Sequence, residues 1–160
     1  MNITVFRIDD RLIHGQVATS WTNYANAKQI VVADDVVIND TFQQSLLKMA
    51  TPRGVELKLL SLEEAKEEIN SGSEDVTDTL FLVRGVTEAN TILEDNNVVE
   101  EINIGNLNMR KGKEKILDNL WVYPEDIEAF RELEQKGLKL EYRTLPNDKK
   151  QSVISLIDKL

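Results

Sequence analysis

Short apolar runs of strand-like composition alternate with segments of helical periodicity along the whole chain. The predicted strands cover residues 3–8, 29–33, 55–60, 79–83, 101–104, 121–123 and 138–143. Regular alternation of strands and helices with short connections is typical of α/β domains, in which helices cover a mostly parallel sheet. We therefore predict a single α/β domain with an open, mostly parallel, twisted sheet and helices on both faces.

An amphipathic segment follows the second predicted strand. Phe42, Leu46 and Met49 recur in it at helical spacing, and Asp40 precedes them as a predicted N-cap. We interpret the apolar pattern of the chain as a buried core with the following members: Phe6, Ile8, Phe42, Leu59, Phe81 and Phe130.

Further helix signals lie between residue 61 and the C-terminus. Ser61 and Glu64 have the spacing of a capping box. Pro124 is predicted to open another helix, which Gly137 ends. The pair Asn147-Asp148 could cap a last helix that continues to the C-terminus.

Composition excludes several classes of site. The chain has 160 residues and no cysteine, so it forms no disulfide, thiolate metal site or cysteine nucleophile. A single histidine argues against zinc, and we predict no metal site. With 19 basic and 28 acidic side chains the net charge is −9, which repels phosphate backbones, and we expect no nucleic-acid partner.

The apolar runs are also far shorter than the roughly 20 residues that a membrane-spanning helix requires. Asp9, Asp10 and His14 interrupt the region where a signal peptide would need to be apolar. We therefore expect a cytoplasmic protein.

The one histidine, His14, lies in the stretch DDRLIHGQ, after the first predicted strand and at the start of the first helix. In open α/β sheets, ligands bind beyond the carboxyl ends of the strands, near helix N-termini. The sequence contains no phosphate-loop, dinucleotide-binding or serine-hydrolase motif. A neutral imidazole is itself a capable nucleophile, which makes His14 the candidate catalytic residue.

A phosphoryl group on His14 would need donors for its negative charge. Gly15 and Gln16 would offer backbone N–H groups in the first helical turn, where the helix dipole favours an anion. Arg11, three residues before His14, could hold the same oxygens with its planar guanidinium.

The remaining polar residues near strand ends leave two interpretations open. Asp9 or Asp10 could orient Arg11 or the loop, or both could simply end the strand beside a helix-start histidine with a satisfied hydrogen bond. The other strand-end pairs are also compatible with ordinary turns: Asp34-Asp35, Arg84-Gly85 and Gly105-Asn106.

The segment from Arg7 to Val17 resembles the active-site segment of enzyme IIB components of the sugar phosphotransferase system, mannose/fructose/sorbose family. The similarity continues over nearly the whole chain, in the family's order, through residues 30–35, 44–50, 52, 54–55, 101–106 and 145–150. The resemblance identifies residues 1–160 as a IIB domain of this type.

The resemblance implies a covalent phosphohistidine intermediate and no cofactor. A IIB component takes a phosphoryl group from a phosphohistidine on IIA and passes it to a sugar imported by the membrane components IIC and IID. The phosphorylated residue matches His14, with the phosphate on Nδ1, and the family's arginine matches Arg11. The sugar stays open among hexoses and amino sugars such as N-acetylgalactosamine.

The resemblance also implies the surroundings in which such a protein works. No IIA-like segment precedes Met1, so we expect IIA to be a separate chain and this protein to associate peripherally with the membrane transporter. A homo-oligomer is left open. We expect a locally basic face around the site, formed by Arg7, Arg11, Arg84 and Lys28.

A second hypothesis belongs to another functional class. A regulatory or binding module could keep the same fold and use phosphorylation of His14 only to switch the docking of a partner. Fold similarity alone does not separate the two hypotheses, because α/β folds host many functions.

Overall fold

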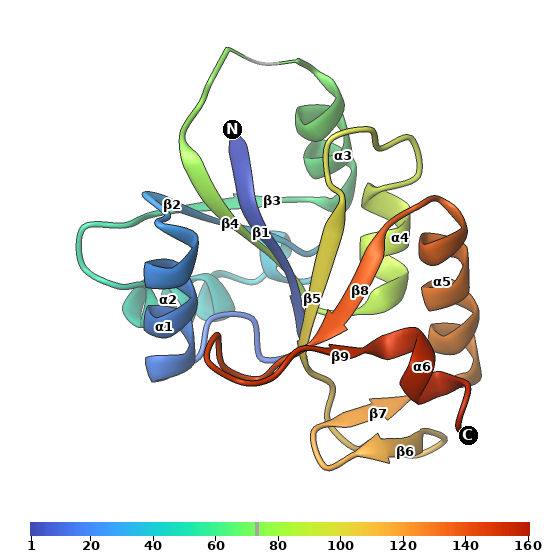
Figure 1. Ribbon diagram of the computed structural model, residues 1–160. Helices are drawn as coiled ribbons and strands as arrows, with labels where there is room; N and C mark the ends of the chain where they lie inside the picture. The colour runs from blue at the N-terminus through green and yellow to red at the C-terminus, as the bar shows by residue number, and fades with distance from the viewer. Residues whose placement is uncertain (73) are drawn as a thin grey trace.

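A seven-stranded sheet runs through the computed structural model, which describes residues 1–72 and 74–160 (Figure 1). The strands lie in the order β3 (Glu56–Leu60), β2 (Gln29–Ala33), β4 (Asp78–Val83), β1 (Asn2–Asp9), β5 (Glu101–Asn106), β8 (Lys139–Tyr142) and β9 (Gln151–Ser152). Neighbouring strands pair in parallel from β3 to β8, and only β9 is antiparallel to its neighbour β8. The predicted mostly parallel sheet is confirmed.

Helices cover both faces of this sheet, as predicted (Figure 1). One face carries α1 (Gly15–Ala25), the 3-10 helix η1 (Val37–Asn39) and α2 (Thr41–Ala50). The other carries α3 (Leu62–Asn70), α4 (Val86–Ile92), α5 (Pro124–Gln135) and α6 (Val153–Ile157). Alternate side chains of the central strands enter the two layers, so Ile30 and Val32 pack under α1 while Val31 and Phe81 pack on the α3–α6 side.

The predicted capping residues form the expected contacts. The Asp40 carboxylate accepts hydrogen bonds from the backbone N–H groups of Phe42 and Gln43, at 3.0 and 3.1 Å. Ser61 and Glu64 form the reciprocal capping box of α3. Pro124 opens α5, which ends at Gln135, two residues before Gly137.

The prediction that the apolar face of α2 lies in the core is wrong. Phe42, Leu46 and Met49 are 71%, 49% and 83% exposed, whereas Leu47 is 7% exposed. Helical periodicity identifies the helix, but α2 has apolar residues on two faces, and only the face carrying Leu47 contacts the sheet. Four of the other predicted core residues are buried: Phe6, Ile8, Phe81 and Phe130. Leu59 is partly buried against the same layer as Leu47.

Two predicted elements near the C-terminus differ from the structure. The predicted strand 121–123 belongs to β7 (Leu120–Val122), which pairs with β6 (Glu114–Leu117) in a separate antiparallel hairpin. The last helix begins at Val153 and is capped by Ser152, because Asp148 instead closes a turn by accepting a hydrogen bond from the backbone N–H of Leu145. The short strand β9 lies between that turn and α6.

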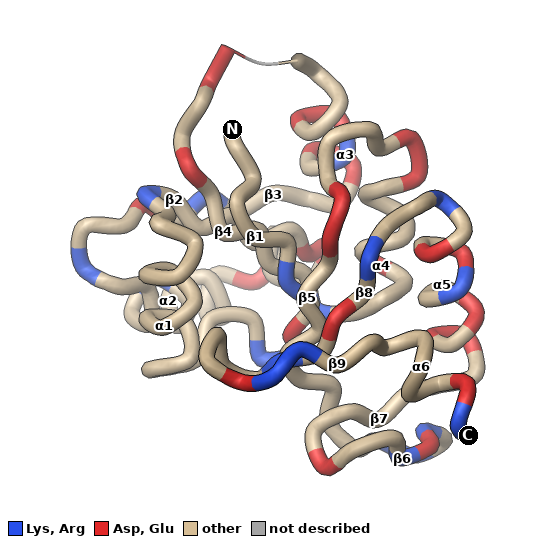
Figure 2. Tube along the Cα trace, viewed as in Figure 1, with Lys and Arg blue, Asp and Glu red and all other residues tan. Residues whose placement is uncertain are grey.

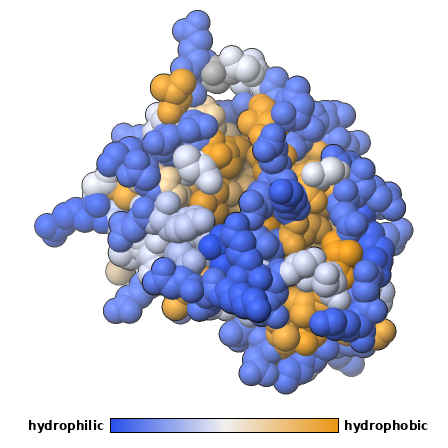
Figure 3. Space-filling view, viewed as in Figure 1, coloured by the Kyte–Doolittle hydropathy of each residue, from blue (hydrophilic) through white to orange (hydrophobic). Residues whose placement is uncertain are grey.

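Charge is distributed unevenly over the two faces. Acidic residues are frequent within α3 and α5 (Figure 2). In contrast, α1 contains no charged residue, and Lys48 is the one charged residue of α2. The surface in Figure 3 is mainly hydrophilic and is interrupted by separate apolar patches. Over the described residues, no helix combines the length and the apolar character that crossing a membrane would require.

Candidate active site

The loop that carries His14 connects the centre of the sheet to α1. β1 lies between β4 and β5, and its last residue, Asp9, precedes a loop that ends at the first residue of α1. α1 covers one face of the sheet, while α4, which follows β4, covers the other. Helices that leave neighbouring strands toward opposite faces open a crevice at the carboxyl ends of those strands, where α/β proteins bind ligands.

Two buried side chains fix the loop backbone. Leu12 and Ile13 are each 5% exposed and pack in the α1–α2 layer, whereas His14 is exposed. The backbone N–H of Leu12 donates to the carbonyl of Asp9 at 2.9 Å, and Leu12 has a φ of 59°. A left-handed conformation costs an L-residue roughly 1–2 kcal/mol, which the burial of Leu12 and Ile13 offsets. The buried side chains of Leu12 and Ile13 therefore hold in place the backbone that carries the exposed imidazole.

His14 is the N-cap residue of α1, and within the described chain its side chain makes no capping hydrogen bond. The first helical bond runs from the N–H of Ala18 to the carbonyl of His14, at 3.2 Å. The N–H groups of Gly15 and Gln16 therefore precede the helical hydrogen-bonding pattern and remain at the exposed end of the helix. Gly15 has a φ of 46°, which glycine adopts without the cost paid by other residues.

Asp9 holds Arg11. Its Oδ1 accepts hydrogen bonds from the backbone N–H and the Nε–H of Arg11, both at 3.0 Å, and its Oδ2 accepts from Nη2 at 2.9 Å. This pairing raises the pKa of the Arg11 guanidinium, chiefly through the side-chain hydrogen bonds to Asp9. Asp9 occupies the Nε–Nη2 edge, so the Nη1 end of Arg11 is the part that it leaves for an anion.

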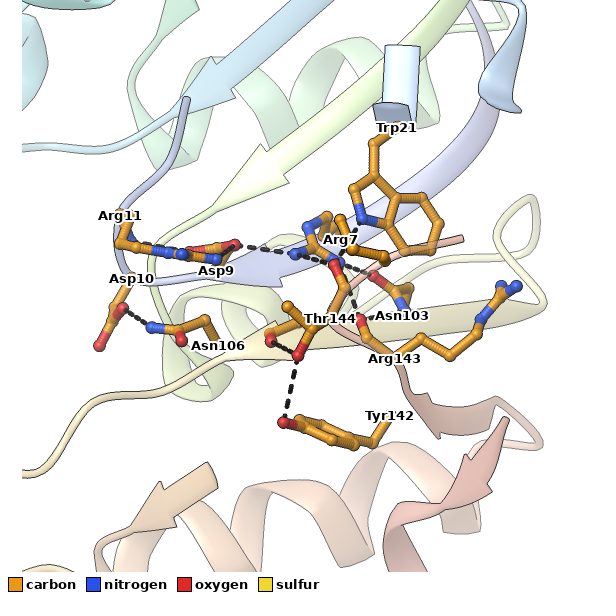
Figure 4. Close-up of polar contacts among 12 residues, drawn as sticks. Arg7, Asp9, Asp10, Arg11, Trp21, Asn103, Asn106, Tyr142, Arg143 and Thr144 are labelled. Atoms are coloured by element: carbon orange, nitrogen blue, oxygen red, sulfur yellow. Dashed lines mark hydrogen bonds and ion pairs between the residues drawn. The ribbon is translucent and has the colours of Figure 1, made fainter. Parts of the chain in front are cut away.

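Asp10 connects the loop to the end of β5. Its Oδ1 accepts hydrogen bonds from Nδ2 of Asn106 and of Asn108, at 2.8 and 3.1 Å, and its backbone N–H donates to the Asn106 carbonyl at 3.0 Å. The two aspartates thus have separate contacts, which the sequence left undecided. Asp9 orients the arginine, and Asp10 orients the loop backbone (Figure 4).

Arg84, at the end of β4, is the second cation beside the loop. Its Nε donates to Oδ2 of Asp34 at 2.8 Å, and its Nη2 donates to Oε1 of Gln43 at 3.3 Å. Asp34 is 4% exposed and also accepts hydrogen bonds from two backbone N–H groups of the loop that follows β2. Arg84 lines one pocket together with the loop residues Arg11, Leu12 and Ile13 and the α2 residues Gln43, Leu46 and Leu47.

The predicted basic face is only half correct. Arg11 and Arg84 lie beside the loop, but Arg7 is 1% exposed and lies inside the fold. Lys28 precedes β2, so it lies at the amino-terminal edge of the sheet, opposite the carboxyl ends where His14 is found. Strand polarity causes this separation, because residues before and after parallel strands lie at opposite edges.

Sequence reasoning missed the buried polar residues behind the loop. Arg7, Asn103, Glu141 and Arg143 are each at most 7% exposed and are joined by hydrogen bonds. Figure 4 shows three of them, Arg7, Asn103 and Arg143. The available signal was a charged residue in the otherwise apolar first strand. Among the described residues, no group of three or more His, Asp or Glu side chains is placed to hold a metal ion.

Comparison with known proteins places this chain in a family. The family model for the sorbose subfamily IIB component of the phosphotransferase system matches residues 3–160. The chain is 35% identical to the sorbose-specific EIIB component of Klebsiella pneumoniae, over all of this chain and 96% of that protein. It is 34% identical to the mannose-specific EIIAB component of Escherichia coli, over all of this chain and 50% of that protein.

Solved structures agree with this placement. The crystal structure of the IIBSor domain of the Klebsiella pneumoniae sorbose permease superimposes with a TM-score of 0.94 at 34% identity, covering 99% of this chain and 98% of that one. The resemblance inferred from the loop and the segments that follow it is confirmed over the whole fold. The chain belongs to the sorbose subfamily of IIB components of the sugar phosphotransferase system.

Proposed function

We propose that this protein carries a phosphoryl group on His14, received from a IIA phosphodonor and delivered to a sugar imported by IIC and IID membrane components. The observation that supports this proposal most directly is the geometry of the loop. An exposed histidine stands at the N-terminus of α1, three residues after an arginine that Asp9 holds by two side-chain hydrogen bonds.

The two transfers balance without a cofactor. In the first, the lone pair of Nδ1 of neutral His14 attacks phosphorus, a P–N bond forms, and the P–N bond of the donor phosphohistidine breaks. In the second, a sugar hydroxyl attacks the same phosphorus, an O–P bond forms, the P–N bond to His14 breaks, and the released imidazole takes up the hydroxyl proton. Phosphoryl transfer needs positioning and charge stabilisation more than covalent machinery. Arg11 and the N–H groups of Gly15 and Gln16 are the groups we assign to that task.

The surface around the loop suits protein partners. His14 is exposed, so two successive partners can each bring a phosphorus to it. Leu46 lines the same pocket as Arg11. Together with Phe42 and Met49 it forms the exposed apolar face of α2. Contiguous exposed apolar side chains commonly mark interaction surfaces. The acidic side chains of α3 and α5 lie on the opposite face of the sheet from α1 and α2.

The test is phosphorylation of the purified protein by the general phosphotransferase proteins and IIA, followed by transfer to sugar on membranes that contain IIC and IID. The label should be lost in mild acid and kept in alkali, as expected for a phosphoramidate. His14→Ala should take up no label while its circular dichroism matches that of the parent. Undiminished labelling of His14→Ala would remove His14 from the mechanism.

The same experiment decides between this proposal and a binding module. A phosphocarrier passes its label to sugar, whereas a module that only switches the docking of a partner keeps its label when membranes and sugar are added. Peripheral association with the membrane then follows from binding to IIC and IID, and sedimentation with membranes should require those components.

The sugar is proposed only as a class, a hexose or an amino sugar. The relatives named for sorbose, mannose and N-acetylgalactosamine are 35%, 34% and 31% identical to this chain, so identity does not choose among them. Competition among these sugars for the phosphoryl group, measured on the cognate membranes, would make the choice.

A further inference from the structure

Arg7 is a charged residue buried within the sheet. It is 1% exposed, although it belongs to the central strand β1. Burial lowers the pKa of its guanidinium to about 10, against the opposing effect of Asp9. A buried charge is tolerated only where hydrogen-bonding and charged partners compensate for its lost hydration. The contacts of Arg7 therefore show which groups its guanidinium stabilises in position.

The contacts of Arg7 occupy both ends of its guanidinium. Nη1 donates to Oδ1 of Asn103 and to the carbonyl of Arg143, the latter at 3.1 Å. Nη2 donates to Oδ2 of Asp9 at 2.9 Å and to the carbonyl of Thr144 at 3.2 Å. The acceptors come from β5, from β1 itself and from the residues after β8, so three segments of the chain fix the guanidinium.

The space around the guanidinium is equally specific. Its central carbon lies 4.6 Å from the centre of the Trp21 ring, which is a cation–π contact. Gly105 also lies against the guanidinium, because a Cβ at that position would be only 2.0 Å from the guanidinium carbon. Trp21 belongs to α1 and donates its indole N–H to the Thr144 carbonyl at 2.9 Å. The helix α1, whose N-cap residue is His14, is therefore tied to the same carbonyl as Arg7.

Asp9 links this buried arginine to Arg11, which is partly buried and lies in the loop. Its Oδ2 accepts from Nη2 of Arg7 and from Nη2 of Arg11, both at 2.9 Å, and Asp9 is 0% exposed. In Figure 4 the three side chains lie in one row, with the carboxylate between the two guanidiniums. Arg7 is held on several sides and Arg11 reaches the loop surface, so the order Arg7, Asp9, Arg11 runs from the fixed end to the functional end.

We propose that Arg7 is a positioning residue for phosphoryl transfer: by fixing the Asp9 carboxylate it sets the orientation in which Arg11 presents its free N–H groups beside His14. The inference rests on the proposed function. Without Arg7, the Asp9 carboxylate keeps only its hydrogen bonds to Arg11. The carboxylate can then rotate, and the guanidinium of Arg11 changes orientation with it. Interactions within one hydrogen-bond network couple by amounts equivalent to roughly 2- to 150-fold in rate.

The test is a double-mutant cycle on single-turnover transfer from phosphorylated IIA. Arg7→Gln should slow transfer by about 10-fold when Arg11 is present, and by less than about 2-fold in the Arg11→Ala background, because the residue acts through Arg11. Arg7→Lys keeps the charge without the planar fork and should fall between the parent and Arg7→Gln. Equal slowing by Arg7→Gln in both backgrounds would overturn the proposal.

Arg143→Gln is the matched control. Arg143 is 6% exposed and lies 5.1 Å from the Trp21 ring, but its guanidinium binds Glu141 and the Pro146 carbonyl rather than Asp9. It should slow transfer by the same factor with and without Arg11. If it couples to Arg11 as strongly as Arg7 does, the effect is general loosening of the network and the proposal fails.

A spectroscopic readout tests positioning without catalysis. The Nε–H resonance of Arg11 should be protected from exchange in the parent and should shift and exchange faster in Arg7→Gln, whereas an unchanged resonance contradicts the inference. If Arg7→Gln does not fold, Asn103→Ala removes one acceptor of Arg7 and enters the same cycle. If the parent takes up no phosphoryl group, the proposed function fails, and the resonance still decides whether Arg7 fixes Arg11.

Discussion

Two regions that meet at the His14 loop depart from the usual distribution of polar and apolar residues. Charged side chains are buried behind the loop, and apolar side chains are exposed beside it. Behind the loop, Arg7 and Asp9 are 1% and 0% exposed. Beside it, on α2, Phe42 and Met49 are 71% and 83% exposed. The buried charges are paired at hydrogen-bonding distances with groups from distant parts of the chain, whereas the exposed apolar side chains lie on the face of α2 that points away from the sheet.

Burying a charge and exposing an apolar side chain have different physical costs. A buried charge without its partner is strongly destabilising, so the network must be maintained by the fold itself. An exposed apolar side chain costs the fold little, because much of any protein surface is apolar. Substitutions in the network should therefore change stability and transfer, while substitutions on the outer face of α2 should leave stability nearly unchanged.

Asp9→Ala should lower the free energy of unfolding strongly. It leaves Arg7 buried without its carboxylate, and removing one partner of a buried ion pair costs about 3–5 kcal/mol. Asp10→Ala is the matched control, since the neighbouring carboxylate is only partly buried and binds Asn106 and Asn108. Urea unfolding of both variants measures the difference. Equal losses would mean that the Arg7–Asp9 pair contributes no more than the loop contact.

Much of the fold could be predicted from local signals. The apolar runs identify the strands of the sheet, and Asp40 and Ser61 mark two helix starts, because a cap depends only on residues within the next turn. The position of His14 at the start of a helix, three residues after Arg11, could also be predicted from the order of strand, loop and helix, whereas the phosphoryl chemistry of the loop was implied by the family resemblance.

The contacts of Arg7 could not be predicted, because they join positions far apart in the sequence. Its acceptors in Asn103 and at Arg143 are 96 and 136 residues away. The choice between Asp9 and Asp10 likewise depended on which side chain points toward β5. For α2, the buried face is selected by contact with the sheet, which periodicity does not specify.

Arg11→Ala tests the partly buried end of the network, in the His14 loop. A hydrogen bond to a charged group contributes about 1.5–3 kcal/mol, so the loss of one such bond from the transition state should slow transfer roughly 10- to 150-fold. Asp9 keeps Arg7 as a partner, so we expect the fold to be retained. Single-turnover transfer from phosphorylated IIA, with thermal melts alongside, measures both quantities. Transfer at the parental rate would show that backbone N–H groups hold the phosphate alone.

Gly105→Ala tests the fit around Arg7 with a single methyl group. The added Cβ would lie 2.0 Å from the guanidinium carbon, and overpacking of this kind typically costs about 1–3 kcal/mol. Shortening the neighbour in the double variant Arg7→Met, Gly105→Ala should make the glycine substitution less costly than it is alone. The two penalties are compared by urea unfolding. A penalty for Gly105→Ala that is the same with either residue at position 7 would show that the strain lies elsewhere.

The smallest effect is expected on the outer face of α2, where Met49→Gln changes a side chain that is 83% exposed. Surface substitutions usually change the free energy of unfolding by less than about 0.5 kcal/mol. Leu47→Ala, on the same helix but at a residue 7% exposed, should cost about 2–5 kcal/mol, because it removes buried methyl groups and leaves a cavity. The two variants share helix, length and capping residue, so they differ mainly in which face is altered. If Met49→Gln destabilised the protein as much as Leu47→Ala, the outer face of α2 would be packed in solution, and the contrast between a fold-maintained network and a freely exposed apolar face would not hold.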